Sequence, residues 1–312
     1  MVYTITLNPA LDYVMFVGKL RYDDINRSRS EALFAGGKGI NVSTVLRELD
    51  VPSVALGFIA GFTGDEIERR LLSSGIAADF TRVKKGLTRI NVKIKAETEL
   101  DVNANGPEVD ENEIAALMEK LDAAREGDVV ILAGAPPKNL PADIYQQMLK
   151  RLDGRGVRFV VDAEGDLLKN ALPYKPLLIK PNHHELAGLF GVPDRLTEEE
   201  IVHYARLLQK EGARNVLVSR GGDGALLVDE NGDVHKLGSL PGKVVNTVGA
   251  GDSMVAGFVA GFLKTGDYAY ALRLGSACGN ATALSEGLAT REKIDRVLDN
   301  IKQQEGGTHE NH

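Results

Sequence analysis

The chain contains few of the residues that thiol and metal chemistry require. Its 312 residues include a single cysteine, Cys278, and no tryptophan. One cysteine excludes an internal disulfide and a zinc site built from four thiolates. The six histidines show neither an HExxH motif nor any other ligand spacing, and only His183 and His184 are adjacent. The sequence therefore predicts neither thiol chemistry nor a histidine-bound metal.

The chain also lacks an excess of basic residues and a long hydrophobic run. Its 37 Lys and Arg residues against 44 Asp and Glu residues give a formal charge of −7, which argues against a nucleic-acid partner. The longest mostly apolar stretch, residues 254–263, is shorter than the ~20 residues that span a bilayer. Asp12 lies where a signal peptide would need apolar residues. We therefore expect a cytoplasmic protein without a membrane or nucleic-acid partner.

Between residues 110 and 219, helical and strand-like patterns alternate. Short apolar runs at residues 129–132, 159–161 and 216–218 each accompany a segment with apolar residues at helical spacing. Strands that are apolar on both faces and alternate with helices are typical of a parallel sheet with helices on both sides. The fold class indicated is α/β.

Local signals mark where several of these elements begin and end. The pairs Asp110/Glu113 and Thr197/Glu200 have the spacing of capping boxes, which start helices. An Asn-Gly pair at residues 231–232 separates two strand-like runs and predicts a hairpin. We therefore expect the sheet to have an antiparallel edge.

One segment departs from this pattern. Residues 88–95 alternate strictly between apolar and polar side chains, with Arg89 on the polar face, which indicates a half-exposed strand. Its apolar face consists of Ile90, Val92 and Ile94. Such a strand and its neighbours form a small sheet that is not stable alone. We expect a lid near residues 12–35 and 87–105 whose outer face pairs with another protomer.

Glycine is abundant, with 34 residues, and much of it lies in three short runs. The first run, residues 36–41, precedes a helical pattern and places backbone N–H groups and Lys38 at a helix start, where an anion is favoured. The alternative is a glycine-rich turn that binds nothing. The GxxxxGK[ST] spacing of a P-loop is missing.

The second run, residues 219–224, follows a predicted core strand. Ligands bind at the carboxyl ends of strands in open α/β sheets, and glycine lets the backbone approach a phosphate. A simple β-turn before the next strand is the alternative reading of this run.

The third run, residues 246–252, precedes a helix of small residues. Gly249, Ala250 and Gly251 expose several N–H groups toward one point, with the carboxylate of Asp252 beside them. An anion hole next to a general base has this composition. The alternative is that Asp252 only complements the helix dipole.

Residues 36–43 and 246–259 resemble the two diagnostic motifs of the ribokinase-like (PfkB) carbohydrate kinases, and their order and separation also match. Within that family, residues 6–12, 57–64 and 88–93 most resemble the bacterial members that phosphorylate fructose 1-phosphate. The resemblance covers residues 1–302 as a single kinase domain. It implies a ribokinase-like three-layer αβα fold with a mostly parallel central sheet and a small β-sheet lid, and it leaves residues 303–312 as a polar, disordered tail.

The resemblance implies ATP-dependent phosphorylation of the 6-hydroxyl of fructose 1-phosphate, which gives fructose 1,6-bisphosphate and ADP. Asp252 would take the hydroxyl proton, and the amides of Gly249, Ala250 and Gly251 would hold charge on the phosphoryl group. The N-x-x-E motif of the family is matched at residues 182–185, which implies Mg²⁺ with Glu185 acting on it indirectly.

The ligand contacts follow from the same resemblance. The residues that would bind the nucleotide are Lys180, Asn182, Glu185, Ser219, Gly221, Gly222, Gly224, Gly251 and Asn280. The residues that would bind the sugar phosphate are Asp12, Gly37, Lys38, Asn41 and Arg89. Of these, the positively charged Lys38 and Arg89 would contact its phosphate group. The resemblance also implies a homodimer joined through the lids.

Three alternatives remain open at this point. Within the class, the substrate could be tagatose 6-phosphate or fructose 6-phosphate. A catalytically idle sugar-phosphate sensor could keep the same fold, although the intact Gly-Ala-Gly-Asp run argues against it. A dinucleotide-dependent oxidoreductase would need GxGxxG directly after the first strand, where Asn8 and Pro9 lie instead.

Overall fold

The main sheet lies in the interior because most of its strands are apolar on both faces. The computed structural model describes residues 1–238 and 242–307. Within them the strands of this sheet are β1 (Val2–Thr6), β4 (Ser53–Ile59), β5 (Ala77–Ala78), β6 (Thr81–Arg82), β9 (Val129–Ala133), β10 (Arg158–Asp162), β11 (Leu178–Ile179), β12 (Asn215–Ser219), β13 (Ala225–Val228) and β14 (Val234–Leu237). Their order is β14-β13-β12-β11-β10-β9-β1-β4-β5, with β6 beside β4.

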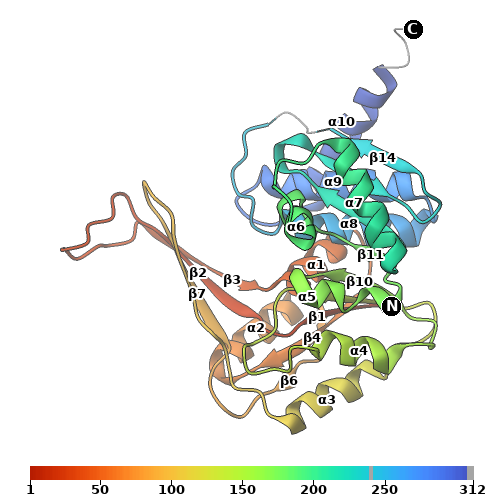
Figure 1. The fold of residues 1–312 in the computed structure, drawn as a ribbon. Helices are drawn as coiled ribbons and strands as arrows, with labels where there is room; N and C mark the ends of the chain where they lie inside the picture. The colour runs from red at the N-terminus through yellow and green to blue at the C-terminus, as the bar shows by residue number, and fades with distance from the viewer. Residues whose placement is uncertain (239–241, 308–312) are drawn as a thin grey trace.

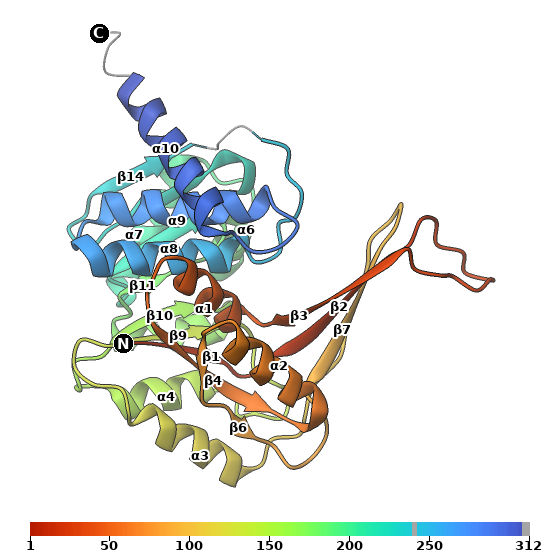
Figure 2. The same ribbon diagram turned by 180° about the vertical axis from the view of Figure 1, so that it is seen from behind.

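Helices cover both faces of this sheet, as Figures 1 and 2 show from opposite sides. One face packs against α1 (Lys38–Glu48), α2 (Gly61–Ser73), α8 (Ala250–Thr265), α9 (Tyr268–Ala283) and α10 (Arg291–Gly307). The other packs against α3 (Glu111–Leu121), α4 (Ile144–Leu152), α5 (Gly165–Lys169), α6 (His183–Phe190) and α7 (Glu198–Glu211). Two short 3₁₀ turns, Leu172–Tyr174 and Gly221–Asp223, complete the layers. The predicted three-layer α/β fold is confirmed.

The local sequence signals also agree with the structure. Asp110 and Glu113 form a complete capping box at α3, and Thr197 and Glu200 form one at α7. Strands β9 to β12 are parallel, whereas β13 and β14 run antiparallel around the predicted Asn-Gly turn. These signals act within a few residues, so the predictions made from them hold.

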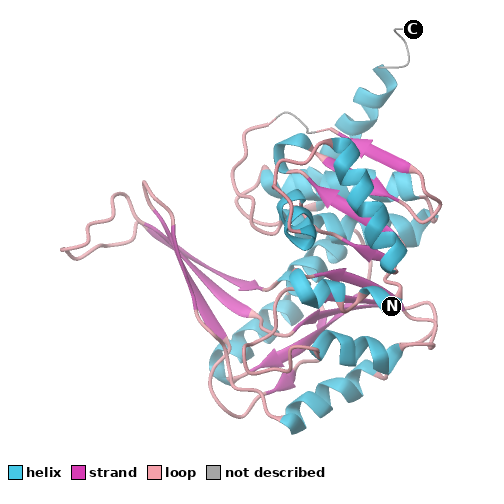
Figure 3. Cartoon of the chain, in the orientation of Figure 1, coloured by secondary structure: helices cyan, strands magenta, loops and turns pink. Residues whose placement is uncertain are grey.

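A second, four-stranded sheet projects from the main body as a long arm (Figure 1, Figure 3). Its order is β3-β2-β7-β8, where β2 is Ala10–Phe16, β3 Ser30–Gly36, β7 Arg89–Lys95 and β8 Leu100–Asn103. We call this sheet the lid. The register places Tyr13, Val92 and Val102 next to one another on one face, and Asp12 beside Asn91 on the other. The apolar and polar faces predicted from the alternation are therefore both present.

The base of the apolar face of the lid is covered, and its outer part is not. Leu11 is buried with Ile67 and Leu71 of α2 in one apolar cluster. Farther out, Leu100 and Val102 are 42% and 56% exposed. The lid is therefore fixed at its root and presents apolar side chains to solvent along its length.

Helix α10 continues to Gly307, so residues 303–307, expected to be a disordered tail, are helical. Buried Leu298 and Ile301 anchor the helix on the body, and a helix held by packed turns can continue past them. Residues 308–312 lie outside the described residues. In the described part of the chain, no helix is both long and apolar enough to cross a membrane.

Candidate active site

Polar side chains meet at the carboxyl edge of the main sheet. β10 ends at Asp162, Lys180 directly follows β11, and β12 ends at Ser219. These three strands are adjacent and parallel, so their ends lie on one edge, where open α/β sheets bind ligands. The start of α1 adds Lys38, which forms an ion pair with Asp162. The start of α8 adds Asp252, which lies close enough for the charges of Asp162, Lys38 and Lys180 to act on its pKa.

Asp252 lies buried in the first turn of α8. Its Oδ2 accepts a hydrogen bond of 2.8 Å from Nδ2 of Asn41, a residue of the first glycine run. Burial, with the negative charge of Asp162 in addition, raises the pKa of Asp252 to about 6, although Asn41 and the charges of Lys38 and Lys180 oppose the shift. A carboxylate that titrates close to neutral pH is suited to accept a proton from a hydroxyl group.

The start of α8 is arranged to hold an anion. The helix begins after Gly249, which has a φ of 79°, and no side chain caps it. The amide of Ala250, expected to face an anion, donates instead to the carbonyl of Thr247 at 3.2 Å, and the amide of Ser253 donates to the carbonyl of Gly249 at 2.9 Å. The amides of Gly251 and Asp252 precede the first i to i−4 bond of the helix and remain for an anion. A Cβ on Gly251 would lie 3.2 Å from Nζ of Lys180. A lysine ammonium group therefore lies directly beside the helix start.

Asp162 is a site residue that the sequence analysis missed. Its side chain is 2% exposed, and its carboxylate lies between two lysines, with Oδ1 3.3 Å from Nζ of Lys180 and Oδ2 3.5 Å from Nζ of Lys38. Burial lowers the pKa of Lys38, but Asp162 and then Asp252 outweigh it, so the net pKa is raised. The available signal was an acidic residue at the carboxyl end of an apolar core strand.

Asn182 and Glu185 form a reciprocal capping box at α6. The Asn182 amide donates to Glu185 Oε2, and the Glu185 amide donates to Asn182 Oδ1, both at 2.8 Å. Burial raises the pKa of Glu185, against the hydrogen bond from Asn182 and the charge of Lys180. The box occupies one carboxylate oxygen and leaves Oε1 available to a ligand.

The residues present fit Mg²⁺ only together with a phosphate ligand. No group of three or more His, Cys, Asp or Glu side chains forms a metal site in residues 1–238 and 242–307. Mg²⁺ in nucleotide enzymes retains several waters and binds through one or two carboxylates plus the substrate phosphates. Glu185, with one available oxygen near Lys180, matches that donor set.

The second glycine run forms a tight turn after β12. A Cβ on Gly224, which has a φ of 86°, would lie 2.1 Å from the Leu237 carbonyl oxygen, whereas a Cβ on Gly221 or Gly222 would meet nothing within 4 Å. The open side of the turn is therefore at Gly221 and Gly222. Arg220 holds the turn through a hydrogen bond from Nη1 to Oε1 of Glu198 at 2.7 Å.

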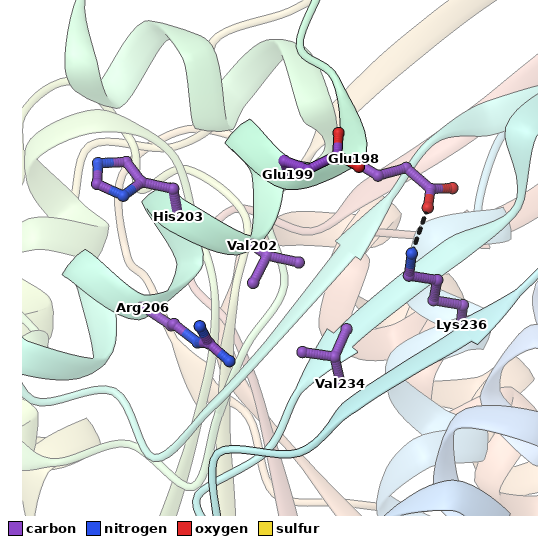
Figure 4. Close-up of a pocket in the computed structure, with 7 residues that line it drawn as sticks. All are labelled: Glu198, Glu199, Val202, His203, Arg206, Val234 and Lys236. Atoms are coloured by element: carbon purple, nitrogen blue, oxygen red, sulfur yellow. Dashed lines mark hydrogen bonds and ion pairs between the residues drawn. The ribbon is translucent and has the colours of Figure 1, made fainter.

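Glu198 also lines a cavity of about 410 Å³ (Figure 4). The cavity lies between α7 and the β13–β14 hairpin and is lined by Glu198, Glu199, Val202, His203, Arg206, Val234 and Lys236. None of these residues was selected from the sequence.

Of the predicted nucleotide residues, Asn280 donates from Nδ2 to the Ser276 carbonyl of its own helix at 2.8 Å.

On the polar face of the lid, Asp12 and Arg89 lie on the neighbouring strands β2 and β7. Asp12 Oδ1 accepts a hydrogen bond of 2.8 Å from Asn91, and burial raises the pKa of Asp12 despite Asn91 and the charges of Lys93 and Arg89. Burial lowers the pKa of Arg89, against the charge of Asp12. Nε of Arg89 and Oδ1 of Asn91 are buried without a hydrogen-bond partner in the described residues.

The first glycine run joins the lid to the main body. A Cβ on Gly36 would lie 2.6 Å from Oδ2 of Asp12, and one on Gly37, which has a φ of 125°, would lie 2.5 Å from Cγ2 of Thr6. Only glycine fits this approach. The structure therefore places Asp12 beside Gly36 at one end of this run and Asp252 beside Asn41 at the other.

The family model for "pfkB family carbohydrate kinase" matches residues 3–294. The chain is 43% identical over 302 residues to a 1-phosphofructokinase of Bacillus subtilis, with 97% of this chain and 99% of that protein covered. It is 37% identical over 302 residues to a D-tagatose-1-phosphate kinase of Bacillus licheniformis, with 97% and 99% covered.

Solved structures agree with these relatives. Phosphofructokinase-2 from Escherichia coli, in complex with substrates and products, superposes with a TM-score of 0.91 at 26% identity, covering 96% of this chain and 99% of that one. A ribokinase from Arabidopsis thaliana superposes with a TM-score of 0.75 at 20% identity, covering 95% and 98%. The latter is a likeness of fold alone.

Proposed function

The chain belongs to the pfkB family of carbohydrate kinases, and on that premise we propose that it transfers the terminal phosphoryl group of ATP to the 6-hydroxyl of fructose 1-phosphate. The observation that carries the proposal is the position of Asp252. This buried carboxylate, with a pKa of about 6, lies in the first turn of an uncapped helix beside Lys180.

Asp252 accepts the proton of the 6-hydroxyl as the oxygen attacks phosphorus, and Asn41 holds the carboxylate in orientation through its 2.8 Å hydrogen bond. The amides of Gly251 and Asp252 and the ammonium group of Lys180 hold negative charge on the phosphoryl group. The nucleotide phosphates lie along the open side of the turn at Gly221 and Gly222. Mg²⁺, held near Glu185, neutralises phosphate charge when it is bound.

The lid supplies the sugar contacts. Asp12 accepts hydrogen bonds from sugar hydroxyls through Oδ2, since Oδ1 is taken by Asn91. Arg89, whose Nε lacks a protein partner in the described residues, meets the phosphate at carbon 1. Gly37 allows the backbone to approach the sugar. Lys38 was expected beside Arg89 at the phosphate of carbon 1, but it pairs with Asp162 near Asp252, so we assign it to the end of the sugar that reacts.

We also propose that two protomers pair through the outer apolar face of their lids. Exposed Leu100 and Val102 and the neighbouring Val92 support this, because contiguous exposed apolar side chains are typical of a contact site. The working location we propose is the cytoplasm, where ATP and sugar phosphates are available.

A coupled assay of ADP release tests the proposed substrate. We expect kcat/KM for fructose 1-phosphate to exceed that for fructose 6-phosphate or tagatose 6-phosphate by at least ~10-fold, about 1.4 kcal/mol of transition-state discrimination. Tagatose 1-phosphate belongs in the same assay, because one relative is named a D-tagatose-1-phosphate kinase. Preference for another sugar phosphate would contradict the substrate, and binding without ADP release would indicate a sensor.

A further inference from the structure

Asp162 is buried at the carboxyl end of β10 and is paired with two cations. Its side chain is 2% exposed, and a carboxylate at this depth needs opposite charge. Lys180 lies 3.3 Å from Oδ1 and Lys38 lies 3.5 Å from Oδ2. Asp162 is therefore the shared counter-charge of two lysines that come from different parts of the chain.

The two lysines retain their hydrogen-bonding capacity. In the described part of the chain, neither ammonium group makes a hydrogen bond to a protein acceptor, and Oδ2 of Asp162 has no hydrogen-bond partner. The pairs are therefore electrostatic, and the N–H groups of both lysines are available to another acceptor. An anion beside Lys38 and Lys180 would receive them.

Asp162 also determines whether Lys38 and Lys180 form ion pairs with Asp252. Both lysines lie close enough to oppose the rise in the pKa of Asp252, yet its carboxylate accepts its side-chain hydrogen bond from Asn41 and forms no ion pair with either lysine. Without Asp162, Asp252 would be one of the few nearby carboxylates left to compensate two cations. A direct ammonium contact would occupy the oxygen that must accept the proton.

The backbone fixes this arrangement. Asp162 ends a strand hydrogen-bonded to β9 and β11, and its carbonyl accepts the Gly134 amide at 3.0 Å. A Cβ on Gly134 would lie 3.7 Å from Cγ of Lys38, so the lysine stem runs past this glycine toward Asp162. A carboxylate on a central strand is a more rigid anchor than one on a loop.

We propose that Asp162 is a positioning residue: it holds the ammonium groups of Lys38 and Lys180 beside Asp252, where both meet the phosphoryl group in transit, and it keeps them from pairing with the base. This inference rests on the proposed kinase function. It adds a further carboxylate to the site and assigns Lys38 to the transfer step.

Asp162→Asn tests the proposal because it keeps size and removes charge. We expect kcat to fall by ~10- to 1000-fold, since a misplaced catalytic group can lower the rate by ~10²-fold. The Kd of ATP, measured by titration without sugar, should stay unchanged or become tighter, because a negative charge leaves an anion site. Asp229→Asn is the matched control, as Asp229 is also 2% exposed but pairs with His235 in the β13–β14 hairpin.

Two further variants separate position from charge. Lys38→Met should lower kcat. The fold-loss of kcat caused by Asp162→Asn should be at least ~5-fold smaller in the Lys38→Met background than in the wild type, because the effects of residues that act together are not additive. Asp162→Glu keeps the charge but misplaces it, so kcat should fall while the Kd of ATP stays within ~2-fold. Asp162→Glu also tests the proposal if the Asp162→Asn protein does not fold.

Several results would overturn the proposal. They are an unchanged kcat in Asp162→Asn, a loss of ATP affinity in proportion to kcat, or additive effects of Lys38→Met and Asp162→Asn. Recovery of kcat at high Mg²⁺ would make Asp162 a metal ligand instead. If the wild type phosphorylates no sugar phosphate, the proposed function fails, whereas the ATP titrations still test the charge arrangement independently.

Discussion

Asp252 is the proposed general base, and its pKa of about 6 determines the expected pH dependence. The deprotonated carboxylate is the active form, so kcat/KM should rise about tenfold per pH unit below pH 6 and level off above it.

Asp252→Asn keeps the side-chain size but removes the base, so turnover should fall by ~10²- to 10⁴-fold with little change in ATP affinity. Rate measurements on both proteins from pH 5 to 8.5 check this. An Asp252→Asn protein with more than half the wild-type turnover contradicts the assignment.

Arg89 is the predicted anchor for the phosphate at carbon 1. Arg89→Ala should weaken binding of fructose 1-phosphate by ~1.5–3 kcal/mol, the range for a hydrogen bond to a charged group, and leave ATP binding unchanged. Separate titrations with each ligand measure the two effects. Lys95→Ala is the matched control, since Lys95 lies on the same strand, farther out, and pairs with Glu99. Equal losses for both ligands would make Arg89 structural.

At this scale the sequence predicts some residues and not others. Asp252 is recognisable because it lies within a short motif whose composition suits an anion hole beside a base, whereas the role of Asp12 was predicted only from the resemblance to the family. Asp162 is not recognisable in this way, because its importance comes from Lys38 and Lys180, which are distant in sequence and meet only once the sheet is assembled. Asn41 was expected at the sugar, and its hydrogen bond to Asp252 depends on the packing of α1 beside α8.

Among the elements, α6 carries a residue, Glu185, whose structural role as a helix cap can be tested separately from its proposed role at Mg²⁺. Glu185→Gln can retain both capping hydrogen bonds, because glutamine also fits a capping box, but it removes the negative charge. The free energy of unfolding should change by less than ~0.5 kcal/mol, while the Mg²⁺ concentration for half-maximal activity should rise by ~10- to 100-fold. Denaturation and Mg²⁺ titrations measure these two quantities.

The control for this variant is Glu200→Gln, which makes the same change in the capping box of α7. Glu200→Gln should alter neither quantity. A Mg²⁺ requirement that is unchanged in Glu185→Gln would remove Glu185 from the metal site and leave it as a helix cap.

Element boundaries follow from local chemistry more closely than element contacts do. The capping boxes, the Asn-Gly hairpin and the alternation of residues 88–95 all predict what the structure contains, because each acts over a few residues. The continuation of α10 to Gly307 was missed, since a polar composition does not by itself end a helix whose preceding turns are packed.

For the whole molecule, the lid determines the expected assembly. Val92 lies between Tyr13 and Val102 on the apolar face, so Val92→Lys places a charge on the surface through which we propose that two protomers pair. We expect a monomer by sedimentation and a raised KM for the sugar phosphate, because the lid also carries Asp12 and Arg89. Leu263→Lys, at a 40% exposed position on α8, is the control. A Val92→Lys protein that remains dimeric with wild-type kinetics excludes this interface.

The central claim is transfer of a phosphoryl group from ATP to the 6-hydroxyl of fructose 1-phosphate, and phosphorus NMR of the reaction mixture tests it most directly. With ATP, Mg²⁺ and fructose 1-phosphate, we predict that fructose 1,6-bisphosphate and ADP appear in equal amounts at the expense of both substrates. Formation of ADP with inorganic phosphate alone, or an unchanged fructose 1-phosphate signal after prolonged incubation, would contradict the claim.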